Sequence, residues 1–175
     1  VYVSTGESYT NDVEGAGIFK SSDDGATWTL LPSTENSVMQ TINEIYVHTN
    51  SDIYAATSSG GLLRSQDGGG SWEKVMGSGL AGGNSDNIHD LYFIASNQTF
   101  YISSDNSIYK STTGDRADWT NIGAGKPGFP SNVNRIEFVV CPTDPNIMYA
   151  IGAVGSFSSK TFVSSDGGEN WTARS

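Results

Sequence analysis

The chain has 175 residues, of which 21 are glycine and 16% are charged, and its 19 acidic and 9 basic side chains give a formal charge of −10. Nucleic acid is therefore excluded as a partner, because phosphate binding needs a clustered basic surface and the Lys and Arg residues are few and scattered. A hydrophobic fraction of 36% is enough to bury a core, which argues against wholesale disorder.

Membrane insertion and metal binding are not expected either. No stretch approaches the roughly 18 consecutive apolar residues of a spanning helix, and residues 1–6 lack the basic and apolar regions of a signal peptide. Any export signal has been removed or never lay in this segment. The single Cys141 cannot close an internal disulfide, and His48 and His89 are the only histidines. We expect no metal and no cofactor.

Short alternating runs of Ile, Tyr, Val and Phe between clusters of Gly, Ser, Asn and Asp predict β-strands along the whole chain. No segment has convincing helical periodicity. In chain order the predicted strands cover residues 1–5, 17–21, 42–47, 53–57, 61–65, 88–93, 99–103, 107–111, 133–138, 147–151 and 160–164. A further outer strand is expected after each tryptophan.

An internal repeat accompanies these strands. Residues 21–28 read Ser-Ser-Asp-Asp-Gly-Ala-Thr-Trp, and similar octapeptides occupy 65–72 and 164–171. A degraded copy at 111–119 has Thr113 where the others have Asp, which predicts a longer or looser hairpin. The four tryptophans lie 44, 47 and 52 residues apart, the spacing of one four-stranded propeller blade.

The repeat predicts an all-β fold, a β-propeller of four-stranded antiparallel blades. We place the blades at about residues 1–31, 41–76, 87–123 and 132–175 of a single domain. The first blade lacks an inner strand, so about three and three-quarter blades are present. Because propellers usually close with about four to eight blades, we expect completion by remaining blades of the same chain or by a second chain.

The octapeptides resemble the Asp-box, or BNR, repeat (Ser/Thr-x-Asp-x-Gly-x-Thr/Ser-Trp), and the resemblance covers essentially the whole chain. Such propellers occur in sialidases, xyloglucanase-type glycoside hydrolases, sortilin-type receptors, a photosystem II assembly factor and large secreted bacterial proteins. The amino-acid sequence of residues 2–28 most resembles the last group, especially exported proteins of Bacteroidetes-like bacteria. The resemblance implies an extracellular or cell-surface location, but fold alone does not transfer function.

The repeated residues have a structural interpretation. Each Asp is expected to accept hydrogen bonds from its own hairpin, a glycine to supply a positive φ, and the Trp to pack between strands. Calcium would need six to eight oxygen ligands, and each hairpin supplies one or two carboxylates. The residues concerned are Asp23, Gly25, Trp28, Asp67, Gly69, Trp72, Trp119, Asp166, Gly168 and Trp171.

Two groups of residues are candidates for a binding role. The resemblance implies that ligands meet the loops opposite the hairpins, where aromatic rings near carboxylates suit stacking on a sugar. These loop residues are Glu7, Tyr9, Asp12, Glu14, Phe129 and Phe157. Aligned inner strands predict a polar cluster at the channel mouth, with an Asp90–Arg135 contact, formed by Glu44, His89, Asp90 and Arg135. Solvated loops without a ligand, and a channel whose charges meet only water, are the alternatives.

The resulting functional hypothesis is a non-catalytic extracellular scaffold or binding segment whose ligand is a carbohydrate or a protein surface. The alternative is part of a xyloglucanase-type glycoside hydrolase propeller, with some catalytic acids outside the segment. Glycosidases need two carboxyl groups about 5 to 9.5 Å apart, and sequence spacing alone does not assign such a pair. A sialidase is disfavoured because it needs several arginines on the substrate carboxylate, and the photosystem factor because no basic patch is present.

Overall fold

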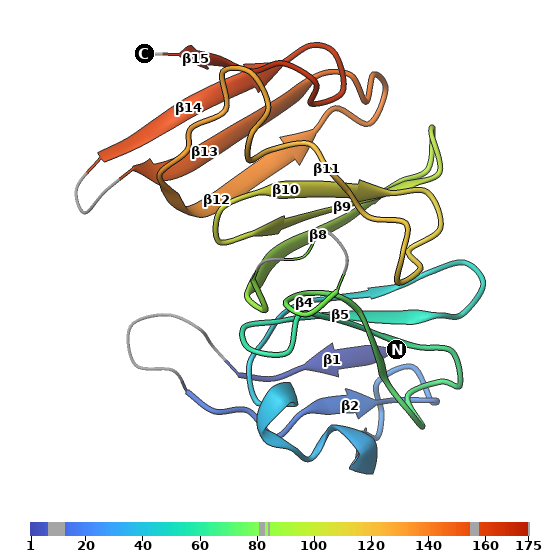
Figure 1. The fold of residues 1–175 in the computed structure, drawn as a ribbon. Helices are drawn as coiled ribbons and strands as arrows, with labels where there is room; N and C mark the ends of the chain where they lie inside the picture. The colour runs from blue at the N-terminus through green and yellow to red at the C-terminus, as the bar shows by residue number, and fades with distance from the viewer. Residues whose placement is uncertain (7–12, 81–82, 84, 155–157, 175) are drawn as a thin grey trace. The chain divides into compact units, whose positions relative to one another are not determined.

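The structure of the protein is a computed structural model that describes residues 1–6, 13–80, 83, 85–154 and 158–174. The strands form four antiparallel sheets (Figure 1). The chain divides into two compact units, residues 1–88 and 89–175. The candidate ligand residues Glu7, Tyr9, Asp12 and Phe157 lie outside the described residues.

The first unit contains two sheets whose strands follow chain order. The first sheet consists of β1 (Tyr2–Ser4), β2 (Ile18–Lys20) and β3 (Thr29–Leu30). The second consists of β4 (Ile42–Val47), β5 (Ile53–Thr57), β6 (Leu62–Ser65) and β7 (Glu73–Met76). Between them lie two 3-10 turns, η1 (Pro32–Thr34) and η2 (Ser37–Met39), the second capped by the Asn36 side chain.

The second unit repeats this arrangement with two four-stranded sheets. The third sheet consists of β8 (Ile88–Ile94), β9 (Thr99–Ser104), β10 (Ile108–Ser111) and β11 (Thr120–Asn121). The fourth consists of β12 (Val133–Val140), β13 (Met148–Val154), β14 (Ser158–Ser164) and β15 (Thr172–Arg174). The expected all-β architecture of antiparallel blades is therefore present, with three strands in the first sheet.

Strand β1 has a partner strand on one side within the described residues, namely β2. The main-chain groups of Val1 exchange hydrogen bonds with Ser21, and the Thr5 amide donates to the Gly17 carbonyl at 3.1 Å. Antiparallel strands alternate in this respect, so the main-chain N–H and C=O groups of Tyr2 and Ser4 point away from β2. Among the described residues, no strand pairs with this side of β1, which is called the open edge below.

The register shows a position that is shared by all four sheets. In the first sheet it lies on β1, and in the other three sheets it lies on the second strand. In every sheet it is opposite the residue that precedes the first serine of the octapeptide repeat. That position is tyrosine every time: Tyr2 opposite Lys20, Tyr54 opposite Arg64, Tyr101 opposite Lys110 and Tyr149 opposite Val163. When the predicted strands 53–57 and 99–103 are aligned from their first residues, Ala55 is matched with Tyr101. The structure places Tyr54 at the position of Tyr101, so that alignment is wrong by one residue.

Each unit buries its own core between its two sheets. In the first, Ile18 and Met39 pack with Ile42, Ala55 and Leu63, and Trp72 lies against this cluster. In the second, Tyr101 and Ile108 of the third sheet pack with Met148 and Phe162 of the fourth. In the first and third sheets, the face that carries the shared tyrosine therefore packs against the other sheet of the same unit.

Candidate functional site

Three of the four octapeptides form the same hairpin, named here the Ser-x-Asp hairpin. In the second sheet, Asp67 Oδ1 accepts from the Ser65 hydroxyl at 2.8 Å and the Ser71 amide at 2.9 Å, while Oδ2 accepts from the Ser71 hydroxyl at 2.6 Å. The Ser65 oxygen in turn accepts from the Gly69 amide. Asp23 and Asp166 make the corresponding contacts. Every carboxylate oxygen is thus engaged inside its own turn.

The hairpin backbone explains the choice of glycine. Gly68 and Gly69 have φ values of 72° and 95°, and Gly167 and Gly168 have 72° and 90°. In the first hairpin Asp24, at φ 57°, precedes Gly25 at 91°. Two successive left-handed residues suit glycine because a Cβ atom is strained there. The repeat glycines that the sequence analysis named therefore have a structural role, because they allow the backbone of the turn to adopt this conformation.

These hydrogen bonds hold the pKa of Asp23, Asp67 and Asp166 at about 2, chiefly through the hydroxyl or amide of Thr27, Ser71 or Asn170. A folded-state pKa below the usual 3.8 favours folding above pH 3.8 and stops doing so as the pH falls toward 2. The ionised hairpins therefore support the fold across the neutral and mildly acidic range.

We expect Asp67→Ala to lower the unfolding midpoint at pH 6 and to have a progressively smaller effect as the pH falls from about 4 to about 2. The reason is that protonation removes the same hydrogen bonds from the unsubstituted protein. Thermal unfolding of both proteins at several pH values measures the difference. Glu35→Ala, an exposed acid outside the hairpins, is the control. A difference that does not change with pH would contradict this account of Asp67.

The degraded repeat closes in another way. Its hairpin is one residue longer between Ser111 and Trp119, and the carboxylate comes from Asp118. Asp118 Oδ2 accepts from the Ser111 hydroxyl at 2.9 Å and from the amides of Thr112 and Thr113 at 3.0 Å each. The expectation of a longer hairpin agrees with the structure, whereas the looser one does not. An Asp directly before the tryptophan was the available signal.

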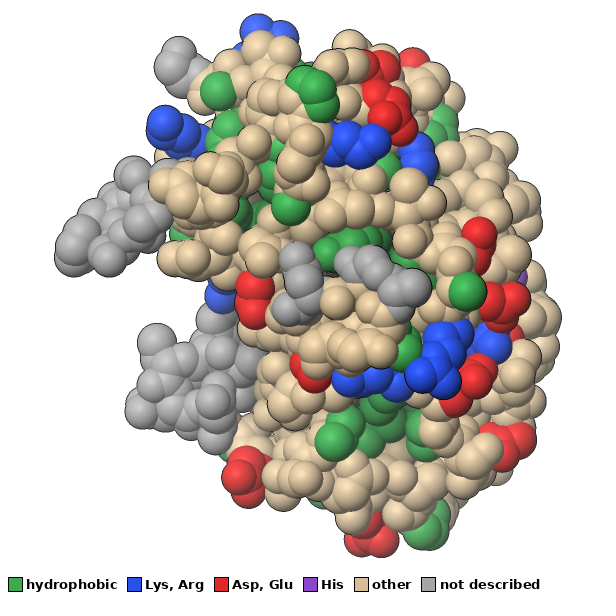
Figure 2. Space-filling model, in the orientation of Figure 1, with side chains coloured by type: hydrophobic (Ala, Val, Ile, Leu, Met, Phe, Trp, Pro, Cys, Tyr) green, Lys and Arg blue, Asp and Glu red, His purple; other side chains and the backbone are tan. Residues whose placement is uncertain are grey.

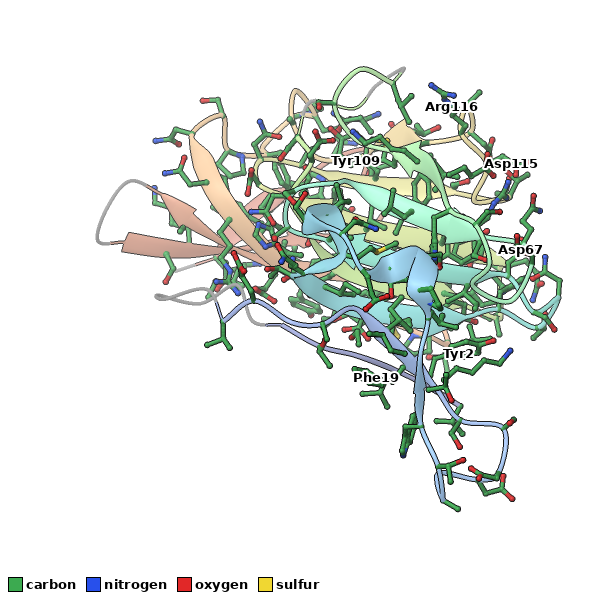
Figure 3. All side chains as sticks on the ribbon, turned by 90° about the horizontal axis from the view of Figure 1, so that it is seen from below. Tyr2, Phe19, Asp67, Tyr109, Asp115 and Arg116 are labelled. Atoms are coloured by element: carbon green, nitrogen blue, oxygen red, sulfur yellow. The ribbon has the colours of Figure 1, made fainter. Side chains whose placement is uncertain are left out.

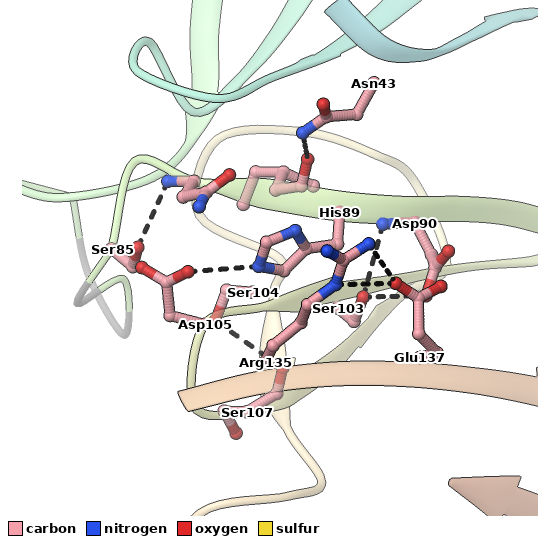
Figure 4. A network of polar contacts seen from close by, with 12 residues as sticks. Asn43, Ser85, His89, Asp90, Ser103, Ser104, Asp105, Ser107, Arg135 and Glu137 are labelled. Atoms are coloured by element: carbon pink, nitrogen blue, oxygen red, sulfur yellow. Dashed lines mark hydrogen bonds and ion pairs between the residues drawn. The ribbon is translucent and has the colours of Figure 1, made fainter. Parts of the chain in front are cut away.

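A polar cluster lies on the inner strands of the second unit (Figure 4). Asp90 of β8 accepts from the Ser103 hydroxyl at 2.9 Å and from the Phe138 amide at 3.4 Å, and it shares a hydrogen bond with Glu137. Glu137 Oε1 accepts from Nε and Nη2 of Arg135 at 2.9 and 2.8 Å. The cluster is therefore two carboxyl groups held together beside one guanidinium.

Burial and the neighbouring Glu137 raise the pKa of Asp90 to about 6. An acid whose folded-state pKa exceeds its unfolded value stabilises the fold below the unfolded pKa, and this contribution is lost as the pH rises through about 6. Two carboxyls in contact behave in this way because they resist being ionised together. Asp90 therefore carries a proton in mildly acidic solution.

We expect Asp90→Asn to gain thermal stability relative to the unsubstituted protein as the pH rises from 4 to 7.5. Asparagine keeps an acceptor for Ser103 and cannot ionise, so the unfavourable charge above pH 6 disappears. Melting temperatures at both pH values measure the change, and Glu35→Gln is the control. A difference between the two proteins that is the same at both pH values would show that Asp90 does not titrate in this range.

The predicted membership of this cluster needs three changes. His89 lies near Asp90 in sequence, but its Nε2 faces Asp105 Oδ1 at 3.0 Å. Arg135 forms its ion pair with Glu137, which the sequence comparison did not select, instead of the predicted pair with Asp90. Glu44 is an exposed residue of β4 in the first unit. Counted from the shared tyrosines, Glu137 of β12 stands at the position of Glu44 in β4, so aligning the strands from their first residues was wrong by two residues here.

The described candidate loop residues differ in their surroundings. Glu14 is exposed and accepts a hydrogen bond from the Gln40 side chain at 3.4 Å. Phe129 is 9% exposed, and its ring meets Trp171 edge-on with centroids 5.3 Å apart. The expectation that Phe129 is presented to a ligand is therefore wrong, since its ring packs in the core of the second unit.

The described residues contain no group of three or more His, Cys, Asp and Glu that could hold a metal ion. On the face drawn in Figure 2, basic side chains lie among acidic ones instead of forming one patch. The described residues also include no helix long and apolar enough to cross a membrane.

The comparisons with known proteins identify the fold family. A family model described as the DUF6242 beta propeller domain matches residues 5–144, most of the chain. This chain belongs to the DUF6242 beta propeller domain family. The match confirms the predicted fold class, a β-propeller, and the four sheets of this DUF6242 propeller are consistent with about four blades. No curated protein matches the sequence.

Solved structures are similar to this DUF6242 propeller in fold. The GH74 enzyme of Niastella koreensis has a TM-score of 0.68 at 22% identity, over 91% of this chain and 26% of the enzyme. YCF48 bound to D1 peptide has a TM-score of 0.56 at 16% identity, over 93% of this chain and 48% of its own. An extracellular domain assigned to a one-component system of B. thetaiotaomicron scores 0.57 at 16% identity, over 84% and 18%.

The chain spans about a quarter of the length of the GH74 enzyme and under half of YCF48. At these identities the likeness extends to the fold and not to substrate or partner. The activity of a whole protein that contains this propeller segment is therefore a matter for proposal.

Proposed function

We propose that this DUF6242 propeller is a non-catalytic scaffold or binding segment of an extracellular or cell-surface bacterial protein, with a carbohydrate or a protein surface as its ligand. The Asp90–Glu137 contact is the observation that carries the proposal. Two carboxyls in contact and a raised pKa coincide here, the combination that would otherwise suggest a catalytic pair.

The geometry of this pair argues against glycoside hydrolysis. Retaining and inverting enzymes hold their carboxyl groups about 5 to 9.5 Å apart, with the sugar or a water between them. Asp90 and Glu137 share a hydrogen bond, so no reacting group fits between them. Ser103, the Phe138 amide and Arg135 occupy further positions on both carboxyls. In the proposal, Asp90 and Glu137 serve to stabilise the inner strands.

The hairpins have a structural role in the same proposal. We assign them to the Asp-box repeat, on the pattern of residues together with the carboxylate contacts of Asp23, Asp67 and Asp166. A rigid scaffold of this kind leaves recognition to its loops. We place ligand contact in the loops that include residues 7–14 and 157, where Tyr9, Glu14 and Phe157 combine aromatic and acidic side chains.

Binding and hydrolysis can be measured on the same samples. We expect retention of the chain by at least one member of a panel of soluble β-glucans, xyloglucan included, or of immobilised extended peptides. We also expect no release of reducing ends from the glucans. Tyr9→Ala should weaken the retention, whereas Glu35→Gln, an exposed acid outside these loops, should leave it unchanged.

Two results would overturn the proposal. One is release of reducing ends that increases with time and disappears in Asp90→Asn or Glu137→Gln, which would make the cluster catalytic. The other is binding that survives substitution of Tyr9, Glu14 and Phe157 together, which would move recognition away from these loops.

A further inference from the structure

We propose that a groove between the third and fourth sheets binds one sugar unit of a neutral carbohydrate, with residues other than the loop residues of the proposed function. The groove has a volume of about 300 Å³. Asn97, Tyr101, Lys110 and Asp118 line it from the third sheet and its turns, and Asn146 lines it from the fourth. Both sheets belong to the second unit and pack on one core. The groove therefore lies between two packed sheets and not on the outer face of either.

The hairpin of the third sheet supplies an acceptor that the Ser-x-Asp hairpins do not have. In those hairpins both carboxylate oxygens are engaged, as Asp67 shows with Ser65 and Ser71. Asp118 instead takes its hydrogen bonds on Oδ2, from the hydroxyls of residues 111–113 and the amides of 112 and 113. None of the described residues donates to Asp118 Oδ1. The departure from the repeat thus leaves one oxygen of a groove-lining carboxylate for a ligand.

The tip of this hairpin lies away from the groove and holds the carboxylate in place. Asp115 and Arg116, labelled in Figure 3, are exposed and lie at the outer end of the turn. The Asp115 amide donates to the Thr113 hydroxyl at 3.0 Å, and that hydroxyl donates to Asp118 Oδ2, also at 3.0 Å. The acceptor is therefore fixed before a ligand arrives, which lowers the cost of binding.

Lys110 supplies donors on the same wall of the groove. It stands on β10 opposite Tyr101, and its Nζ donates to the Gly167 carbonyl of the fourth sheet at 3.1 Å. An ammonium group has three N–H donors, so two remain. Lys110 and Asp118 form no ion pair within the described part of the chain, although both line the groove. A ligand between them has room to accept from one and donate to the other.

The shared tyrosine position differs between the two units in a way that keeps this groove open. Tyr2 holds the position in the first unit, and its hydroxyl donates to the Gly68 carbonyl of the following sheet at 3.4 Å. The Tyr101 hydroxyl bonds instead to the Asn97 side chain at 2.9 Å. The tyrosine therefore bridges two sheets in the first unit, whereas in the second it stays on the wall of its own sheet.

The chemistry of these groups favours a neutral carbohydrate. Lys110 donates, Asp118 Oδ1 accepts, and the Tyr101 hydroxyl and the two asparagine amides do both. Each hydroxyl of a sugar is also both a donor and an acceptor, so neighbouring hydroxyls can accept from the ammonium and donate to the carboxylate. A ligand with a net charge would meet one like charge in the groove. The volume is at the lower end of small-molecule sites, which suits a single sugar unit.

Amide chemical shifts of residues 1–175 during titration with D-glucose, D-galactose, D-mannose or N-acetyl-D-glucosamine test the proposal. We expect at least one of these sugars to shift the amides of Thr112 and Asn146, with saturation in the millimolar range. Thr120→Tyr fills the groove from an exposed position and removes no side-chain hydrogen bond. It should raise the dissociation constant about tenfold or more, and so should Lys110→Met, which removes the donors.

The fourth sheet offers a matched control in Thr172→Tyr. Thr172 directly follows the repeat tryptophan, as Thr120 does, and is also exposed. It pairs with Val163, whereas Thr120 pairs with Lys110, and it does not line the groove. The same substitution there should leave sugar binding unchanged.

Three results would overturn the proposal. One is that none of the four sugars shifts these amides, and another is that folded Thr120→Tyr and Lys110→Met both bind as tightly as the unsubstituted chain. The third is that glycine shifts the same amides at lower concentrations than any sugar, which would assign the two charges to a zwitterionic amino acid. Substitution of Tyr9, Glu14 and Phe157 together should leave this binding unchanged, so failure of the loop ligand and failure of the groove are distinguishable.

Discussion

Replacement of Trp171 by alanine should cost about 3–5 kcal/mol of the free energy of unfolding. The side chain is 4% exposed, packs edge-on against Phe129 and donates its indole N–H to the Ile122 carbonyl at 2.8 Å. The substitution leaves a large cavity in the core of the second unit and a carbonyl without this donor. Urea unfolding followed by circular dichroism measures the loss.

The repeat provides its own control in Trp28→Ala. Trp28 occupies the same hairpin position but is 41% exposed and bonds only to Gly25 of its own turn. We expect a cost below about 1 kcal/mol, as for surface substitutions. Equal losses for the two variants would mean that the sheets do not depend on the burial of the tryptophan, and the packing account of the hairpin would be wrong.

A second large effect is expected from Gly168→Ala. Gly168 has a φ of 90°, and a Cβ there would lie 2.7 Å from the Ile122 Cβ and 3.1 Å from the Ile122 carbonyl oxygen. The left-handed backbone costs roughly 1–2 kcal/mol for alanine. Overpacking against a neighbour that cannot move away adds roughly 1–3 kcal/mol. Chemical denaturation gives the sum.

Gly125→Ala separates these two contributions. Gly125 has a similar φ of 82°, but a Cβ there meets nothing within 4 Å. Only the backbone cost of roughly 1–2 kcal/mol should therefore remain. If Gly125→Ala were as costly as Gly168→Ala, the close approach of the hairpin to Ile122 would contribute nothing measurable.

Local sequence signals were sufficient for much of the fold. Alternation and turn residues give the bounds of β4 and β5 as the structure has them, and the spacing of the four tryptophans gives the sheets. The reason is that a meander depends on neighbours in sequence, where turn chemistry and side-chain alternation determine pairing. The two 3-10 turns, η1 and η2, were not predicted, because single turns have too few residues to show periodicity.

The polar cluster was harder to predict because it joins strands that are distant in sequence. Asp90 and Arg135 were selected, but Glu137 was missed because the inner strands were aligned from their first residues, which is two residues away from their register against the shared tyrosines. Phe129 was misjudged for a related reason. A Gly- and Pro-rich loop resembles exposed chain, and only the tertiary contact with Trp171 places the ring in the core.

The open edge of β1 makes the two sides of this strand distinguishable by hydrogen–deuterium exchange. The amides of Val3 and Thr5 face β2 and should exchange slowly, whereas those of Tyr2 and Ser4 point away from it and should exchange quickly. A strand added at this edge would protect the second pair and leave the first unchanged. Packing on the exposed face of the sheet would not produce that alternation, so exchange along three or four residues distinguishes a neighbour that pairs with β1 from one that covers it.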